Sequence, residues 1–413
     1  MESSSVFMRN SRYVLILLVL TVVLTGCRAP QEAEVDYGRP LPAGELALRK
    51  LVDPVDIPDF TIASYELDNL RVAIANSLNY MAKPSSQNFF PYGMITHDRA
   101  VASLKRLGEM LDSGLRGRAL NAAIKRDFDV YISVGCDNKG TVLFTGYYTP
   151  IFDGSMARTE RFKYPLYKQP KDLAKSPEGR ILGRQLASGA IKPYPTREEI
   201  ERTGMLKGNE LVWLSDPFEV YIAHVQGSTM IRLGDGKIIT AGYAANNGHP
   251  YHSVANEMTR DGTIPLEHMS LTTMINYFRQ HHGEVARYTY KNPRYIFFQL
   301  SNTTPRGSIN EPVTTMRTIA TDKSVYPRAS LAFISAKLPR NIAGQIETRA
   351  FTGFVLDQDT GGAIRAPGRC DVYMGTGHEA GKMAGQTYQE GKLYYLFLKA
   401  GYRPGIRSIG SFR

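Results

Sequence analysis

The sequence predicts a mainly β protein with flanking helices, of the α+β class. Its 413 residues include 37 glycines and 23 prolines, and tyrosine is the commonest aromatic residue. Helical periodicity is confined to a few segments, whereas runs of β-branched and aromatic residues alternate with glycine-containing turns through most of the chain. The length fits two domains of ordinary size or one domain with a large insertion.

The first 26 residues have the pattern of a secretory signal peptide. Arg9 and Arg12 precede an apolar run, Val14 to Leu24, that is too short to cross a bilayer comfortably. The run ends in Leu24-Thr25-Gly26-Cys27, which resembles a bacterial lipobox. We therefore expect cleavage before Cys27 and lipidation of its thiol. The alternative is a plain signal peptide followed by a coincidental cysteine.

The residue after the cysteine bears on localisation. Bacterial lipoproteins that are not sorted to the outer membrane typically carry Asp directly after the lipidated cysteine. By this resemblance, Arg28 indicates an outer-membrane anchor that faces the periplasm. Residues 27–62 hold few large apolar side chains and are expected to form a tether.

The formal charge of +11 favours a partner with fixed negative charge. Removing residues 1–26 leaves about +10, because the leader carries Arg9, Arg12 and Glu2. Anionic lipid and peptidoglycan, with its peptide carboxylates, both qualify as partners. No Lys/Arg-rich block or nucleic-acid motif is present, so nucleic acid is not expected. A basic protein with no charged partner stays open.

Helical spacing predicts helices over 64–82, capped by Ser64, from Asp98 to Leu115, and over 118–128. Strands are expected at 129–135 and 141–148, paired as a hairpin through the turn Asp137 to Gly140. The stretch 151–303 has short strands (211–215, 218–225 and 229–233), a Gly234–Gly236 turn, and helices capped by Thr196 with Glu199 and by Ser270. Strands and tight glycine turns return after Ser301.

The densest set of candidate catalytic groups is Asp359-Thr-Gly-Gly-Ala-Ile364 followed by Asp371-Val-Tyr-Met-Gly375. A carboxylate at a strand start beside a glycine-rich loop can be partly desolvated, which raises its pKa towards that of a general acid. Asp322 precedes a further strand, Leu331 to Ile334. For Asp322 and Asp359 the favoured interpretation is a turn cap that bonds backbone N–H groups. Asp371 is the candidate acid.

These aspartates, with Gly361-Gly362-Ala363-Ile364 between the last two, resemble the three-aspartate domain that ends the A-type membrane-bound lytic murein transglycosylases. The resemblance covers about 130 to 385 and extends to several further strings: Phe144-Thr145-Gly146-Tyr147-Tyr148-Thr149-Pro150, Val225-Gln226-Gly227-Ser228, Tyr243 to Tyr251, and Asn292-Pro293 through Phe297-Phe298. Two departures stand out. Pro327-Arg328-Ala329 replaces the family's Pro-x-Gly, and the spacing from Asp359 to Asp371 is one residue longer than expected.

The resemblance implies a double-psi β-barrel formed by 63–150 and 304–413, a second β-domain inserted at 151–303, and a glycan groove between them. It implies cleavage of the β-1,4 bond between N-acetylmuramic acid and N-acetylglucosamine in peptidoglycan. The muramic acid's own 6-hydroxyl attacks C1 and leaves a 1,6-anhydro end. One carboxylate can then act first as acid and then as base, and the matched residue is Asp371. Asp322, Asp359, Gly361 and Gly362 would support the site.

Substrate contacts are expected from Thr145, Gly146, Tyr147, Tyr148, Gln226 and Ser228. Tyrosines offer a ring face and a hydroxyl to each sugar. Because neighbouring strand residues point to opposite faces, we expect only one of Tyr147 and Tyr148 to face the groove. Two rival functions stay open: a non-catalytic peptidoglycan-binding lipoprotein, and a glycan hydrolase of the same fold that uses Asp357 or Glu379 as a second carboxylate.

Cysteine and histidine add little chemistry. Cys136 and Cys370 are the thiols left after lipidation of Cys27, and in an oxidising compartment they are either bonded to each other or free. His249, His252, His281 and His282 show no zinc-ligand spacing. No metal and no cofactor are expected.

Overall fold

The computed structural model describes residues 35–177 and 179–402. The chain divides into two units, Met1–Asp36 and Tyr37–Arg413. Of the first unit only Val35 and Asp36 are described, so the account below concerns the unit that begins at Tyr37. The predicted signal peptide and Cys27 lie outside the described residues.

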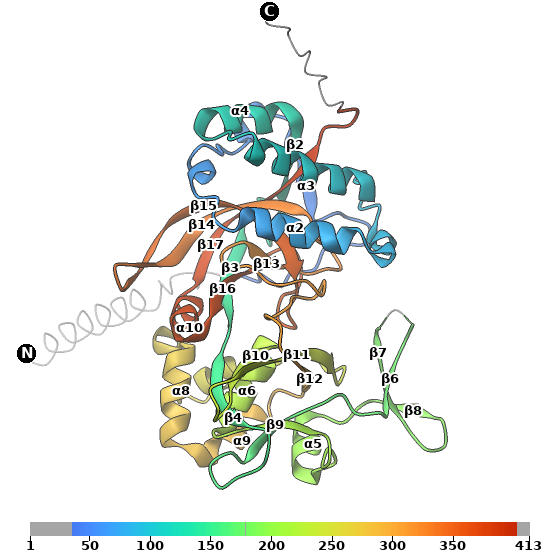
Figure 1. Cartoon of the computed structure of the whole chain (residues 1–413), viewed down its shortest axis with the longest axis vertical. Coiled ribbons are helices and arrows are strands. Elements are labelled where there is room, and N and C mark those ends of the chain that lie inside the picture. The colour runs from blue at the N-terminus through green and yellow to red at the C-terminus, as the bar shows by residue number, and fades with distance from the viewer. Residues whose placement is uncertain (1–34, 178, 403–413) are drawn as a thin grey trace, which may run out of the picture. The chain divides into compact units, whose positions relative to one another are not determined.

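A closed barrel of six strands forms the first lobe (Figure 1). Hydrogen bonds run around the ring in the order β17-β14-β15-β13-β16-β3, and β3 pairs with β17 to close it. Around the ring, β16 is parallel to β3 and β13 is parallel to β15, and the other adjacent strands are antiparallel. The strands are β3 (Val142–Thr149), β13 (Thr318–Ala320), β14 (Leu331–Ile342), β15 (Gln345–Asp359), β16 (Arg369–Thr376) and β17 (Tyr388–Leu398). This closed, mainly β architecture confirms the predicted fold class.

Helices cover the barrel, and two short strands extend its sheet. They are α2 (Leu70–Met81), α3 (His97–Asp112), α4 (Gly117–Asp127), α10 (Gly377–Gly385), β1 (Leu48–Lys50) and β2 (Phe128–Ser133), with 3-10 turns at Pro54–Asp56, Ile62–Tyr65 and Pro84–Phe89. The helix predicted from 64 begins only at Leu70, because residues 62–65 form a separate 3-10 turn that holds Ser64. α3 and α4 match their predictions closely, although Thr96 caps α3.

The predicted tether is too long. β1 pairs with β2, and Ala47 and Phe60 are fully buried in the barrel's core. The chain is therefore packed against the barrel well before residue 62.

The hairpin predicted at Asp137–Gly140 is also wrong, although the turn itself forms. β2 pairs with β17 from Phe128 to Ile132, and β3 pairs with β17 from Val142 to Thr145. Both strands run antiparallel to β17, so the chain keeps its direction across the turn instead of reversing. β2 and β3 therefore do not pair with each other, because β17, near the C-terminus, forms the backbone hydrogen bonds with both.

The second lobe is built on a six-stranded sheet of order β12-β11-β10-β4-β9-β5 (Figure 1). All its strands lie between Ile151 and Ser301: β4 (Ile151–Ser155), β5 (Tyr164–Tyr167), β9 (Glu210–Leu214), β10 (Thr229–Arg232), β11 (Ile238–Asn246) and β12 (Ile296–Ser301). A separate three-stranded sheet contains β6 (Leu173–Lys175), β7 (Ile181–Gln185) and β8 (Ile191–Lys192). β4 follows β3 after Pro150 alone, so one extended segment links the barrel to the insertion.

The described residues of the insertion form five α-helices: α5 (Arg197–Thr203), α6 (Pro217–Gln226), α7 (Val254–Arg260), α8 (Leu271–Gln280) and α9 (Val285–Thr289), with 3-10 turns at Leu266–His268 and His282–Glu284. The capping box of Thr196 and Glu199 and the Ser270 cap form as predicted. The strand predicted at 218–225 is wrong, because these residues form α6. Asp216 caps it, Pro217 occupies its first turn, and Gly227 ends it in the left-handed conformation.

Within the described part of the chain, no helix combines the length and apolar character needed to span a membrane.

Candidate active site

Asp371 lies on β16, where it faces Ala320 of β13 on one side and Thr145 of β3 on the other. Its neighbours Cys370 and Val372 are fully buried in the barrel core. Strand alternation therefore turns the Asp371 side chain to the opposite face, where 17% of it is exposed and it lines a cleft.

Two polar side chains hold the Asp371 carboxylate. The Thr145 hydroxyl donates a hydrogen bond to Oδ1. Arg369 Nη2 lies 4.0 Å from the same oxygen and donates to Thr145 Oγ1 at 3.3 Å. Burial raises the pKa of Asp371 to about 6, with a further increase from Asp359 and an opposing decrease from Arg369. Asp371 can thus hold a proton or release it near neutral pH.

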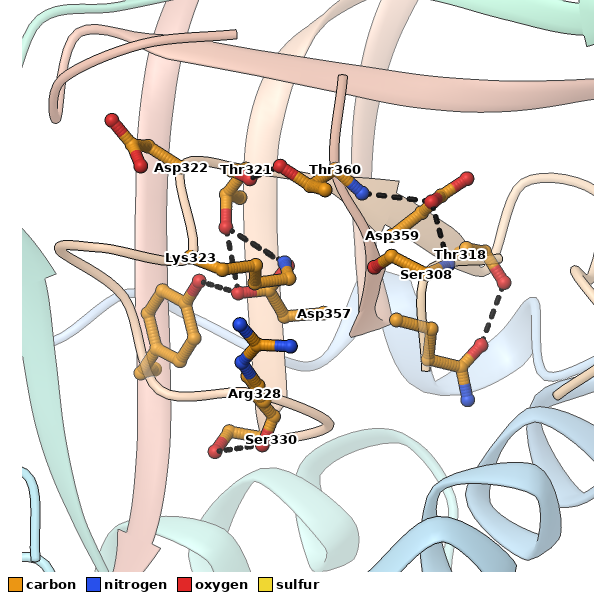
Figure 2. A network of polar contacts seen from close by, with 12 residues as sticks. Ser308, Thr318, Thr321, Asp322, Lys323, Arg328, Ser330, Asp357, Asp359 and Thr360 are labelled. Carbon is orange, nitrogen blue, oxygen red and sulfur yellow. Dashed lines mark hydrogen bonds and ion pairs between the residues drawn. The ribbon is translucent and has the colours of Figure 1, made fainter. Parts of the chain in front are cut away.

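Asp359 is the last residue of β15, and its carboxylate holds the neighbouring loops through hydrogen bonds. Its Oδ1 accepts from the backbone N–H groups of Ser308 and Thr360, each at 2.8 Å (Figure 2). Its Oδ2 accepts from the Tyr147 hydroxyl at 2.9 Å. Burial raises the pKa of Asp359 despite these bonds, so this carboxyl also lies in a desolvated place. The predicted role as a cap of backbone N–H groups is seen.

Asp322 is a turn cap as well, and it does not line the cleft. Its Oδ1 accepts from the Ser324 backbone N–H at 3.0 Å, and its Oδ2 accepts from the Ala366 N–H at 2.8 Å. Asp322 therefore ties the loop before β14 to the loop that leads into Asp371.

The rival second carboxylates lie elsewhere. Asp357 is fully buried in the barrel, where it pairs with Lys323 and accepts a hydrogen bond from Thr321 (Figure 2). The Tyr395 hydroxyl donates a further hydrogen bond to it. Glu379 on α10 is half exposed and pairs with Lys382 at 2.8 Å. Neither side chain lines the cleft that holds Asp371.

The cleft has a volume of about 770 Å³ and is lined by residues of both the barrel and the insertion. Eight of the predicted site residues line it: Gly146, Tyr147, Gln226, Ser228, Asp359, Gly361, Gly362 and Asp371. Tyr148 does not, because it packs in the barrel core with 6% of its surface exposed. Only one of the two neighbouring tyrosines faces the cleft, as strand alternation predicts.

Two predicted sugar contacts have structural partners instead. Thr145 does not line the cleft, and its hydroxyl is used by Asp371. Gln226 does line it, but its Oε1 accepts from the Tyr148 backbone N–H at 3.1 Å. That bond joins the end of α6 to β3 and orients the side chain, which leaves both N–H groups of the Gln226 amide for a ligand.

Gly146 has a packing reason to be glycine. A Cβ placed there would lie 2.7 Å from the Ala384 Cα of α10. The close approach of helix and strand excludes any side chain from this point of β3.

Among the residues that the sequence did not single out are Tyr251, Arg294 and Arg365, which line the cleft, and Arg369, which lies beside Asp371. Arg369 precedes Asp371 by two residues on one strand, so alternation alone could have placed both on one face. Tyr251 and Arg294 lie within two of the family-like strings, Tyr243 to Tyr251 and Asn292 to Phe298, so the resemblance is the signal that could have marked them. Burial is the main cause of the raised pKa of Tyr251, and the Asp371 carboxylate raises it further.

The two described cysteines are free and buried, so the disulfide left open by the sequence is not formed. Cys370 lies in the barrel core, and Cys136 packs against Gly368 in the turn after β2. Burial raises the pKa of both thiols, which keeps them protonated and unreactive. Across residues 35–177 and 179–402, no three His, Cys, Asp or Glu side chains gather in a group that could hold a metal ion.

Comparisons with known proteins agree with this architecture. The model of the MltA specific insert domain matches residues 143–299, and that of the 3D domain matches 317–397. The chain is 30% identical over 274 residues to membrane-bound lytic murein transglycosylase A of Escherichia coli K12, covering 65% of this chain and 69% of that protein. It is 31% identical over 277 residues to the homologue of Buchnera aphidicola, covering 66% and 70%.

Solved structures share the fold. A membrane-bound lytic murein transglycosylase from Agrobacterium tumefaciens superposes with a TM-score of 0.70 at 23% identity, over 86% of this chain and 98% of that one. E. coli MltA with bound chitohexaose superposes with a TM-score of 0.63 at 24% identity, over 89% and 96%. The barrel, the inserted sheet and the cleft between them define a peptidoglycan lytic transglycosylase. The chain belongs to the membrane-bound lytic murein transglycosylase A family.

Proposed function

We propose that the enzyme cleaves the β-1,4 bond between N-acetylmuramic acid and N-acetylglucosamine with Asp371 as its single acid and base. Protonated Asp371 gives its proton to the leaving oxygen as the bond from C1 to that oxygen breaks. The resulting carboxylate then takes the proton of the muramic acid 6-hydroxyl as O6 bonds to C1. The product is a 1,6-anhydro ring, and no water is consumed.

One observation carries this proposal: Asp371 lines the cleft with its pKa raised to about 6. The other carboxylate in the cleft that comes from the barrel strands, Asp359, already accepts three hydrogen bonds. A hydrolase needs a second carboxylate as base or nucleophile. The commitment of Asp359 to Tyr147 and two backbone N–H groups favours the route without water.

The remaining site residues are given roles that follow from their contacts. Thr145 and Arg369 position the Asp371 carboxylate. Asp359 and Asp322 hold the surrounding loops. Tyr147, Ser228 and the amide nitrogen of Gln226 contact the glycan. The E. coli relative solved with chitohexaose supports a glycan strand as the ligand of this cleft.

Asp371→Asn removes the ionisable proton but keeps the size of the side chain. We expect cleavage of purified sacculi to fall at least about a thousandfold, within the range for loss of an acid and base. Binding to sacculi should persist. The matched control is Glu379→Gln, an exposed carboxylate outside the cleft, which should stay active. An active Asp371→Asn enzyme would remove the basis of the assignment.

The products separate the lytic route from hydrolysis. Digestion in oxygen-18 water should give 1,6-anhydromuramic ends without label at C1, measured by mass spectrometry of the released muropeptides. Labelled reducing ends would show a hydrolase. Binding without any product from the wild-type protein would show the non-catalytic alternative.

We also propose that the mature chain is lipid-anchored at Cys27 in the outer membrane and faces the periplasm. The lipobox-like Leu24 to Cys27 and Arg28 support this, as do the relatives named membrane-bound. Cys27→Ser should release an active protein from the membrane fraction. If fractionation still finds the variant in the membrane, Cys27 is not the anchor.

A further inference from the structure

Two arginines in the cleft have no carboxylate partner. Arg294 lies just before β12 in the insertion, and Arg365 lies in the loop between β15 and β16. Neither forms an ion pair with any carboxylate in the part of the chain that the structure describes. The other two arginines that line the cleft differ, because Arg197 and Arg306 each lie within 4.0 Å of a glutamate oxygen.

Arg294 is held in place by the backbone around it. Its Nη1 donates to the His249 carbonyl at 3.0 Å. Its Nε lies against Gly362, where an added Cβ would sit 3.0 Å away. The guanidinium thus approaches the barrel's loop at a point where the loop has no side chain, and it is fixed before any ligand arrives.

The two cations repel each other. Burial lowers the pKa of Arg294, and Arg365 lowers it further. An anion bound near both would offset this repulsion and replace part of the lost hydration. Guanidinium groups bind carboxylates with paired, charge-assisted hydrogen bonds.

We propose that Arg294 and Arg365 form a subsite for the carboxylates of the peptide stems on the glycan strand, so that the enzyme favours strands that carry stems. The inference rests on the proposed function, because it takes peptidoglycan as the substrate of this cleft. On a strand with stems the sugars are neutral, because each lactyl carboxyl of muramic acid that bears a stem is tied up in an amide, and the carboxylates belong to the stems. Two guanidinium groups without a carboxylate partner therefore fit the stem and not the sugar.

The test compares one glycan with and without its stems. Sacculi are digested directly, or after an amidase has removed the peptides and coupling with methylamine has converted the lactyl carboxylates that the amidase leaves into neutral amides. For both glycans, kcat and KM are measured with the full chain. Wild type should show the lower KM on strands with stems. Arg294→Gln with Arg365→Gln should raise that KM about tenfold, as expected for loss of charge-assisted bonds, and leave KM on bare strands within about twofold.

Arg118→Gln is the matched control, because it removes an exposed arginine of α4 outside the cleft. Equal KM changes on both glycans, or no change on stem-bearing strands, would overturn the proposal. Thermal unfolding of each variant checks that the fold is kept.

Gly362→Ala gives a second test that leaves both charges in the chain. Its Cβ should displace Arg294 and raise KM on stem-bearing strands in the wild type, but add little once Arg294 is glutamine. Additive effects would mean that Gly362 acts without Arg294. The anhydro or reducing end of the product reports on the proposed function separately, so a hydrolytic product with the same KM pattern would overturn only the mechanism.

Discussion

Four aspartates lie on the barrel strands or in the loops beside them, and the groups that each contacts give it a different role. Asp357 faces a lysine, Asp322 and Asp359 accept backbone N–H groups, and Asp371 has Thr145 as its hydrogen-bond donor with Arg369 at 4.0 Å. Burial without a close counter-charge is what raises the pKa of Asp371 to about 6. The carboxylate that is least compensated is therefore the one able to exchange a proton.

The pH dependence follows from that pKa. The first step needs protonated Asp371, so kcat/KM should fall as pH rises through about 6 and approach a tenfold loss per unit above it. Arg369 lowers the pKa of Asp371, so Arg369→Gln should move this midpoint to higher pH. Initial rates on sacculi between pH 4 and 9 measure both. A midpoint that Arg369→Gln leaves in place would assign the titration to another group.

The same shift predicts a stability change. The carboxyl of Asp371 holds its proton to higher pH in the folded chain than in the unfolded chain, where its pKa is near 3.9. Its ionisation therefore costs stability as pH rises from about 4 to 6. Asp371→Asn should raise the Tm at pH 7 and show no such gain at pH 4. This gain also shows that loss of activity in the variant does not come from unfolding.

The sequence could predict that Asp322 and Asp359 cap turns, because that use of aspartate is local, and its resemblance to the family singled out Asp371 as the candidate acid. It could not show that Thr145 and Gln226 are used inside the protein, since their partners lie 226 and 78 residues away. The departure at Ala329 has a local meaning too. This alanine has a φ of 55°, a conformation that suits the glycine of the family pattern better.

At the scale of elements, the structure differs from the sequence prediction at α6 and at the turn between β2 and β3. α6 carries Asp216-Pro217 at its start and Gly227 at its end, which are helix signals, but its β-branched and aromatic run favours a strand. Burial in the insertion's core decides for the helix, since most of its side chains are covered. The turn after β2 has residues typical of a hairpin, yet β2 and β3 on either side of it both pair with β17 and not with each other.

Asp357 of β15 contacts the loop that carries Thr321 and Lys323 (Figure 2). It also accepts a hydrogen bond from Tyr395 of β17, so it joins three parts of the barrel. Asp357→Asn leaves a buried lysine without its counter-ion. We expect the free energy of unfolding to fall by about 3–5 kcal/mol, measured by urea denaturation. Adding Lys323→Met should restore much of it, because asparagine still accepts the Tyr395 hydrogen bond.

The exposed pair of Lys382 and Glu379 is the control for this ion pair. Lys382→Met should change the free energy of unfolding by less than about 1 kcal/mol. If Asp357→Asn costs no more than that, the buried pair does not stabilise the barrel. Activity of the surviving folded fraction should be near wild type, since neither Asp357 nor Lys323 lines the cleft.

At the scale of the molecule, the chain leaves the barrel after β3 and returns to it after β12. The sequence placed these boundaries near 150 and 303 because the pattern of strands and turns changes there. The strands of the inserted sheet lie within Ile151–Ser301. The cleft was harder to derive, because its two walls come from segments whose approach depends on contacts such as Gln226 with Tyr148 and Arg294 with Gly362.

Net charge acts at this largest scale. The chain carries a formal +11, so its field should attract the carboxylates of peptidoglycan over distances longer than any contact in the cleft. Salt shortens that range to roughly 4 Å at 0.5 M. Binding of the Asp371→Asn variant to sacculi should therefore weaken about tenfold between 0.05 and 0.5 M salt, measured by co-sedimentation. Binding to chitin, an uncharged glycan, should change little over the same range, because hydrogen bonds and ring contacts in the cleft are not screened. Equal weakening on both would show that salt acts on the protein itself, and constant binding to sacculi would show that cleft contacts alone supply the affinity.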